Sequence, residues 1–187
     1  MPTGEIQTDA IVRDALDKGK HVYIPYLHKA PPASEETPGR VMDMVRLKNL
    51  HDYETLKPDR WGIPSIDPAT LPERQRVLGG HDSPSLDLML MPGVAFDLDE
   101  TAGTIRRLGH GKGFYDYFLH RYLDQREDQL GNSRTPILLY GLALTEQFLT
   151  GSSDEETVPT GQLDEPLHGL ILGNGDIKSS RHSHIKI

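Results

Sequence analysis

The stretch from Arg107 to Asp116, RLGHGKGFYD, contains the residue types that phosphate chemistry needs. Glycines stand at alternate positions, 109, 111 and 113, so the backbone there can turn tightly and come close to a ligand. Two cations, Arg107 and Lys112, lie beside these glycines, and Asp116 adds a carboxylate. Backbone amides, cations and one acid together suit a nucleotide phosphate with a bound Mg²⁺.

The elements on either side place this stretch at the start of a helix. Residues 86–91 are an apolar run that ends at a Pro-Gly pair, which predicts a strand followed by a turn. After the glycines, apolar side chains recur at the spacing of one helix face: Tyr115, Phe118, Leu119, Tyr122 and Leu123. A helix start offers free amide hydrogens and a favourable dipole, and both attract an anion.

A purely structural interpretation of the same stretch is also open. Glycine-rich turns before helices are common, and Asp116 would then only stabilise the helix start. The stretch is not a Walker motif, because no Ser or Thr follows Gly-Lys, and its G-x-G-x-G spacing differs from G-x-G-x-x-G. The residues alone therefore predict an anion site and leave its ligand open.

Composition restricts the class of protein. The chain has 187 residues, for which one domain is the default, and 36% hydrophobic with 26% charged residues is ordinary for a globular protein. It has no Cys, which excludes disulfides and Cys-ligated zinc. The net charge of −8 argues against a general nucleic-acid binder, and no apolar run approaches the length of a membrane span.

Strands and helices alternate along the rest of the chain. Apolar runs predict further strands at residues 21–26, 41–47, 137–144 and 167–172, and helices are expected at 8–18 and, briefly, at 145–149. Residues 29–40, 49–71 and 151–160 read as loops, with only short turns in 49–71. The pattern predicts an α/β sandwich with a mainly parallel sheet, with residues 1–177 as one domain and 178–187 as a disordered tail. The loops after Met91 and Leu144 should open at the carboxyl edge of that sheet, where ligands bind.

The sequence resembles the 5-formyltetrahydrofolate cyclo-ligase family, also called methenyltetrahydrofolate synthetase. The resemblance rests on PGVAFD followed by RLGHGKGFYD, and shorter matches extend it over most of residues 1–173: Met1-Pro-x-Gly-Glu5, Met42-Asp-Met44, Trp61-Gly-Ile-Pro64 and Val158-Pro159 with Asp164. It implies a three-layer αβα fold like that of the sugar-phosphate isomerases and CoA transferases. It also implies a cytoplasmic, monomeric enzyme that acts on a reduced folate, without nucleic acid or membrane partners.

The family's site residues can be carried over position by position. ATP would lie against residues Arg107, Leu108, Gly109, His110, Gly111, Lys112, Gly113, Phe114 and Tyr115, with Arg107 and Lys112 acting on the transferred phosphoryl group. Asp116 and Asp164 would hold Mg²⁺. The folate would contact Glu5, Trp61 and the loop from His110 to Phe114. Taken alone, Glu5 and Asp164 read as surface acids, and Trp61 equally reads as core.

Some features depart from the family. His110 stands where the family usually has arginine or another variable residue, and Phe114 stands where it usually has tyrosine. The loop at residues 98–106 is longer than is usual in the family. The chain begins almost at the helix of residues 8–18, so we expect that it lacks the family's earlier helix and first strand. The alternatives to an active cyclo-ligase are a non-catalytic fragment or relative that binds nucleotide or folate weakly, and a sugar-phosphate isomerase, which the RLGHGKGFYD motif disfavours. A mitochondrial location would follow if a preceding segment carried a transit peptide.

Overall fold

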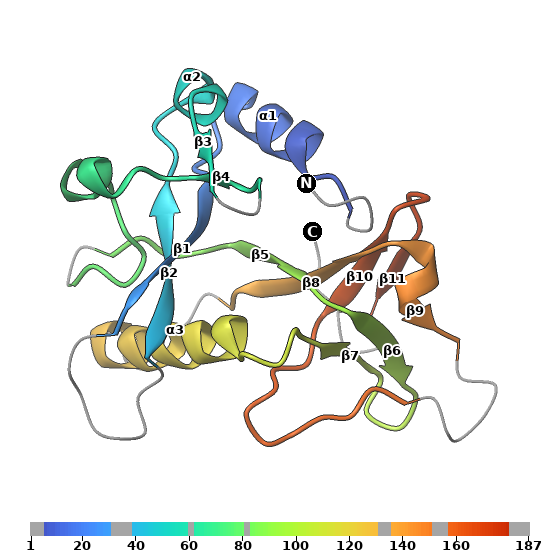
Figure 1. The fold of residues 1–187 in the computed structure, drawn as a ribbon. Helices are drawn as coiled ribbons and strands as arrows, with labels where there is room; N and C mark the ends of the chain where they lie inside the picture. The colour runs from blue at the N-terminus through green and yellow to red at the C-terminus, as the bar shows by residue number, and fades with distance from the viewer. Residues whose placement is uncertain are drawn as a thin grey trace. The chain divides into compact units, whose positions relative to one another are not determined.

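The computed structural model describes residues 6–30, 39–59, 62–80, 83–130, 136–150 and 157–179 (Figure 1). The contacts divide the chain into two compact units, which are described one at a time. The first consists mainly of Gln7–Ser85 and His120–Asn132, and the second mainly of Leu86–Leu119 and Ser133–Ile187. This division concerns contacts within the chain, and the single domain over residues 1–177 stays a prediction.

The first unit is built on an antiparallel pair of strands. Helix α1 (Asp9–Asp17) ends at Gly19, whose φ of +70° is the left-handed conformation that terminates helices. Strand β1 (Tyr23–Lys29) then pairs with β2 (Arg40–Arg46) from Tyr23 opposite Arg46 to Lys29 opposite Arg40. Buried side chains run along β2 and just beyond it: Val41, Met42, Asp43, Met44, Val45 and Leu47. The helix and both strands confirm the sequence prediction.

Residues 49–71 were predicted to hold only short turns, and the described residues from 49 to 73 form short elements. They are α2 (Leu50–Glu54), the two-residue strands β3 (Lys57–Pro58) and β4 (Pro64–Ser65), and the 3₁₀ helix η1 (Pro68–Glu73). Side-chain caps start both helices, because Asn49 accepts a hydrogen bond from the Asp52 amide and Asp67 accepts one from the Ala69 amide.

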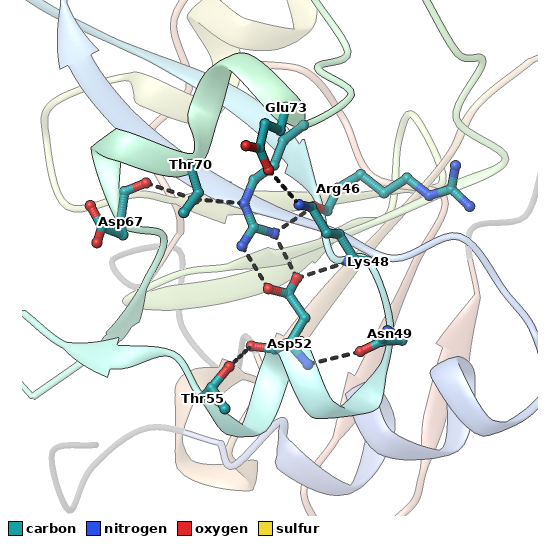
Figure 2. A network of polar contacts seen from close by, with 9 residues as sticks. Arg46, Lys48, Asn49, Asp52, Thr55, Asp67, Thr70 and Glu73 are labelled. Carbon is teal, nitrogen blue, oxygen red and sulfur yellow. Dashed lines mark hydrogen bonds and ion pairs between the residues drawn. The ribbon is translucent and has the colours of Figure 1, made fainter.

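A polar network around Asp52 and Arg74 links α2 and η1 to the end of β2 (Figure 2). Both guanidinium Nη atoms of Arg74 donate to the Asp52 carboxylate at 2.6 Å, and Nη1 also donates to the carbonyl of Arg46. Arg74 Nε donates to Thr70 Oγ1, and the Lys48 amide donates to Asp52 at 2.8 Å. Hydrogen bonds therefore join α2, η1 and the carbonyl of Arg46 at the end of β2.

The second unit contains two sheets. In one, β8 (Leu138–Ala143) lies between β5 (Leu88–Pro92) and β10 (Gly169–Leu172) and is parallel to both, while β11 (Ile177–Ser179) is antiparallel to β10. In the other, β6 (Ala95–Asp99) lies between β7 (Thr104–Leu108) and the short β9 (Phe148–Leu149). The α/β class is confirmed.

The prediction of a mainly parallel sheet holds for the four-stranded sheet, where β8 is parallel to both β5 and β10, but the sheets of the chain are mixed. Residues 98–106, predicted to be a loop, instead form an antiparallel hairpin of β6 and β7, with Asp97 opposite Arg106. Residues 173–176 form a second tight reversal, where Gly175 adopts a φ of +92°. Connections of this length can only return a strand antiparallel. Lys178 and Ser179 therefore belong to β11, although they were assigned to the tail, and residues 180–187 lie outside the described part of the chain.

Helix α3 (Phe114–Leu130) follows the glycine-rich stretch, as predicted. Its predicted apolar face is confirmed, because Phe118, Leu119 and Tyr122 are buried.

The core of the second unit is closely packed at Gly141 of β8: a Cβ there would lie 2.6 Å from a ring carbon of Phe96 and 2.7 Å from Leu170. Only glycine fits there. The helix predicted at residues 145–149 is shorter, a 3₁₀ turn η2 (Thr145–Gln147) that runs into β9.

Candidate active site

The glycine-rich turn, residues 109–113, connects β7 directly to α3. Gly111 and Gly113 have φ angles of +76° and +60°, which residues with a side chain rarely adopt. The carbonyl of Gly113 accepts a hydrogen bond from the Tyr117 amide at 2.9 Å, so the helix begins immediately after the turn. A Cβ at Gly109 would lie 2.9 Å from Arg107 Nη1, so its glycine permits close approach to that guanidinium. Each glycine has a structural reason, and the turn ends at a helix start.

A buried ion pair lies at the two ends of this stretch. Arg107 Nη2, from the end of β7, donates to Asp116 Oδ2, in the first turn of α3, at 2.6 Å. The side chains are only 5% and 10% exposed. Arg107 Nη1 also donates to the carbonyl of Pro92 at 3.2 Å, and its guanidinium lies 5.8 Å from the centre of the Tyr115 ring. The pair thus joins the carboxyl end of β5, strand β7 and the helix start.

This ion pair is incomplete within the described residues. Arg107 Nε and Asp116 Oδ1 are both buried and have no hydrogen-bond partner there. Leaving a buried polar atom without a partner costs about 1–3 kcal/mol, and most such atoms in folded proteins are satisfied. Arg107 Nε can therefore donate to an acceptor, and Asp116 Oδ1 can accept from a donor or bind a cation, that the described residues do not supply.

The carboxyl ends of β5 and β8 lie at one edge of their sheet, as predicted. Gln147, in the loop after β8, joins the two ends: its Nε2 donates to the carbonyl of Gly93 at 2.9 Å, and its Oε1 accepts from the Leu144 amide at 2.8 Å. Gln147 fixes the backbone of the Pro92-Gly93 turn, whose Pro92 carbonyl also binds Arg107. No motif in the sequence pointed to Gln147.

Comparison with known proteins places the chain in a family. The sequence profile described as the 5-formyltetrahydrofolate cyclo-ligase family matches residues 1–172. A Caenorhabditis elegans protein named "Probable 5-formyltetrahydrofolate cyclo-ligase" is 36% identical over 172 residues, which cover 90% of this chain and 68% of the relative. The Saccharomyces cerevisiae 5-formyltetrahydrofolate cyclo-ligase is 29% identical over 184 residues, 95% of this chain and 74% of the relative. The chain belongs to the 5-formyltetrahydrofolate cyclo-ligase family.

A relative with a stated location widens the comparison. The Arabidopsis thaliana protein named "5-formyltetrahydrofolate cyclo-ligase, mitochondrial" is 28% identical over 179 residues, 94% of this chain and 55% of the relative. In the described part of this cyclo-ligase family member, no helix is both long and apolar enough to cross a membrane.

The remaining residues that the family resemblance singled out are placed differently. His110, Gly111, Lys112 and Gly113 are exposed on the turn, while Leu108, Phe114 and Tyr115 are partly buried. Asp164 is exposed, and its Oδ2 accepts a hydrogen bond from the Gly161 amide at 2.7 Å, within its own turn. Glu5 and Trp61 lie outside the described residues. The sequence predicted that Arg107 binds phosphate and that Asp116 binds a metal ion. In the structure these two residues instead form an ion pair with each other.

The carboxylates that the structure describes fit a Mg²⁺ site in which the protein supplies only one or two ligands. Among the residues that the structure describes, no group of three or more His, Cys, Asp or Glu side chains could hold a metal ion. Mg²⁺ commonly takes only one or two carboxylates from a protein and completes its shell with water and substrate phosphates. Asp116 Oδ1, a buried carboxylate oxygen that has no partner among the described residues, is a suitable ligand atom for that role.

Proposed function

We propose that this protein catalyses the ATP-dependent cyclisation of 5-formyltetrahydrofolate to 5,10-methenyltetrahydrofolate, with release of ADP and phosphate. The observation that carries the proposal is the glycine turn between β7 and α3, which leads into a helix start beside an incomplete Arg107–Asp116 pair. Family membership and the printed names of the relatives support the same reaction.

The reaction needs alignment more than covalent help from the protein. The formyl oxygen attacks the γ-phosphorus of ATP, and the bond to ADP breaks. The other folate nitrogen then attacks the activated formyl carbon and loses its proton, and the carbon–oxygen bond breaks so that the former formyl oxygen leaves as part of the phosphate. Such transfers depend on positioning the two substrates and on neutralising charge that develops on the phosphoryl oxygens.

The glycine turn supplies groups of this kind. We propose that residues 107–115 line the ATP. The exposed Lys112 would reach the transferred phosphoryl group, and the buried Arg107 would add positive charge beside the same group. Asp116 and Asp164 would hold Mg²⁺, which when bound would neutralise phosphate charge. Glu5, Trp61 and the loop from His110 to Phe114 would contact the folate.

Further proposals rest on the resemblance alone. We propose that the chain adopts the three-layer αβα arrangement of the sugar-phosphate isomerases and CoA transferases. We also propose that it acts as a monomer, in the cytoplasm or, with a transit peptide, in mitochondria. Sedimentation of the purified protein would test the monomer.

A second candidate function is weak binding of nucleotide or folate without turnover. The observation that favours it is the engagement of Arg107 by Asp116 and by the Pro92 carbonyl, which occupies a cation that the reaction would use. In an active enzyme, the Arg107 guanidinium must either bind phosphate while it keeps its bonds to Asp116 and the Pro92 carbonyl, or exchange one of these partners for phosphate.

One experiment separates these functions. Purified protein is mixed with ATP, Mg²⁺ and 5-formyltetrahydrofolate, and the methenyl product is followed by absorbance while ADP is measured separately. We expect one ADP for each methenyltetrahydrofolate. If no product forms but Mg-ATP or 5-formyltetrahydrofolate raises the thermal unfolding midpoint, the protein is a binder only. If neither is seen, both proposals are wrong.

A further inference from the structure

The hairpin of β6 and β7 holds the segment of residues 157–167 at both of its ends. At one end, the Val158 amide donates to Asp97 Oδ2 at 2.8 Å, and both residues are buried. At the other, Ile105 and Leu167 exchange backbone hydrogen bonds of 2.8 and 3.2 Å. Figure 1 shows this segment as the orange coil below β6 and β7. Asp164 lies between the two attachment points and is itself exposed.

Asp97 carries the first of these attachments. The residue is only 3% exposed. Its carboxylate accepts hydrogen bonds from Arg106 Nε at 2.7 Å and Nη2 at 2.6 Å, in addition to the one from the Val158 amide. A bidentate arginine fixes both the charge and the orientation of a carboxylate. Asp97 therefore presents Oδ2 to Val158 in one defined direction.

Strand β7 connects this attachment to the glycine turn. Arg106 and Arg107 are neighbours, so their side chains leave the strand on opposite faces. Arg106 binds Asp97 on the facing strand, whereas Arg107 binds Asp116 of α3. Two adjacent arginines thus tie one strand to both stretches that carry the proposed Mg²⁺ ligands, Asp116 and Asp164.

We infer that Asp97 is a positioning residue, which through Arg106 and the Val158 amide holds the segment carrying Asp164 in register with β7 and the glycine turn. The inference rests on the proposed function, because it assigns Asp164 to the same metal as Asp116. Asp97 touches neither substrate nor metal in this account, and it acts only through the segment it holds.

The chain offers a matched control for Asp97. Asp43 on β2 is also buried, and it accepts from Arg76 Nε at 2.7 Å and from the Met44 and Leu78 amides. Both acids are strand aspartates that join an arginine to backbone amides, but Asp43 lies in the first unit, and the partners found for it among the described residues are Arg76, Met44 and Leu78. Asp97→Asn and Asp43→Asn should therefore both lower the unfolding midpoint, and only the first should alter the metal site.

The first measurement is hydrogen–deuterium exchange without any ligand. Asp97→Asn should speed exchange in peptides that cover residues 157–167, whereas Asp43→Asn should speed it around residues 41–46 and 76–78. Wild-type exchange over 157–167 in Asp97→Asn would overturn the inference.

The second measurement is binding of Mn²⁺ as a probe for Mg²⁺, with ATP present and free Mn²⁺ read by electron paramagnetic resonance. Asp97→Asn should weaken Mn²⁺ binding about tenfold, the low end of what losing a group that orients a metal ligand costs. Asp43→Asn should bind like the wild type. Equal affinities for the two variants would overturn this inference alone. A wild-type protein that binds no Mn²⁺ with ATP would overturn the proposed metal site as well.

Arg106→Lys serves as a second variant if Asp97→Asn does not fold. It keeps the positive charge and loses the bidentate geometry, so the Val158 contact is weakened rather than removed. We expect changes of the same sign in exchange and in Mn²⁺ affinity, but smaller ones. A folded Arg106→Lys protein that is unchanged in both measurements would contradict the proposed role.

Discussion

The Asp52–Arg74 pair of the first unit and the Arg107–Asp116 pair of the second have similar geometry and different surroundings. In both, the shortest contact between nitrogen and oxygen is 2.6 Å, and the arginine side chain is 5% exposed. Asp52 also accepts from the Lys48 amide, and Arg74 Nε is bound by Thr70. In the second pair, Arg107 Nε and Asp116 Oδ1 find no partner among the described residues.

This difference in hydrogen bonding indicates that the Asp52–Arg74 pair is structural, whereas the Arg107–Asp116 pair is suited to binding a ligand. Asp52 and Arg74 are satisfied by short elements of the chain itself, so nothing further is needed to complete them. Arg107 and Asp116 lie where a strand, a glycine turn and a helix start meet, and they have bonding capacity left over. A buried polar atom without a partner calls for an explanation, such as an ordered water, a bound ion or a catalytic role.

Removing Asp52 should have the largest effect, and that effect should be on stability alone. Asp52→Ala leaves the Arg74 guanidinium buried without its carboxylate, which typically costs 3–5 kcal/mol, and we expect about 3 kcal/mol because Asp52 is 15% exposed. Urea unfolding measures the loss. Turnover at a temperature where the variant is folded should be unchanged.

The control for this prediction is Asp14→Ala. Asp14 pairs with Lys18 in the same helix at 2.8 Å, but both side chains are about two-thirds exposed, at 64% and 65%. Exposed pairs of this kind contribute little to stability. If the two variants unfold at the same urea concentration, the Asp52 network does not have the structural role assigned to it.

Removing Lys112 should have the opposite signature. Its side chain is exposed on the turn and supports no packing, so Lys112→Ala should leave the unfolding midpoint unchanged. If Lys112 acts on the transferred phosphoryl group, turnover should fall about a hundredfold or more, the scale of losing one preorganised donor. Lys48→Ala, which removes an exposed lysine paired with Glu73, is the matched control and should alter neither quantity. Near-normal turnover in Lys112→Ala would remove this residue from the mechanism.

Acid should weaken the structural pair in a defined direction. Hydrogen bonds from Arg74 hold the pKa of the Asp52 carboxyl below its usual value. The unfolded chain therefore takes up this proton at a higher pH than the folded chain does. The stabilisation is fully present above the unfolded pKa of about 4, and it is lost as the pH falls through the folded value.

Asp52→Asn isolates this contribution. Backbone hydrogen bonds also lower the pKa of Asp99, so the wild type alone does not report on Asp52. The gap in unfolding free energy between wild type and Asp52→Asn should shrink as the pH is lowered below about 4. A gap that stays constant down to about pH 2 would show that the pair does not depend on the Asp52 charge.

Much of the fold could be predicted because its buried strands are continuous apolar runs. Residues 137–144 and 167–172 each contain a strand of the parallel core, and residues 86–91 overlap a third, which ends at Pro92. The β6–β7 hairpin was missed because its charged residues look like a loop in sequence. Asp97 and Arg106 are directly opposite in the hairpin and neutralise one another, which only the pairing reveals. A turn signal was present at Gly103, whose φ is +68°.

The candidate site was predicted in its residues and not in its internal contacts. The glycine turn and the helix start were visible as composition and spacing. The Arg107–Asp116 pair was not, because a separation of nine residues indicates a contact only once the turn's positive φ angles bring the helix start back to the strand end. Gln147 acts through backbone groups of a distant segment, and no local pattern marks it. Asp97 lies in the PGVAFD motif, but its contact with the Val158 amide, 61 residues away, cannot be read from the sequence.

The most direct test of the distinction between the two pairs compares Asp116→Asn with Asp52→Asn. Each change removes one carboxylate from a buried arginine pair with little change in side-chain size. Binding of Mn²⁺ in the presence of ATP is measured by electron paramagnetic resonance, at a temperature where both variants are folded. We predict that Asp116→Asn weakens Mn²⁺ binding about tenfold or more, whereas Asp52→Asn retains the wild-type affinity. Wild-type Mn²⁺ affinity in Asp116→Asn would contradict the assignment of the incomplete pair to the ligand site.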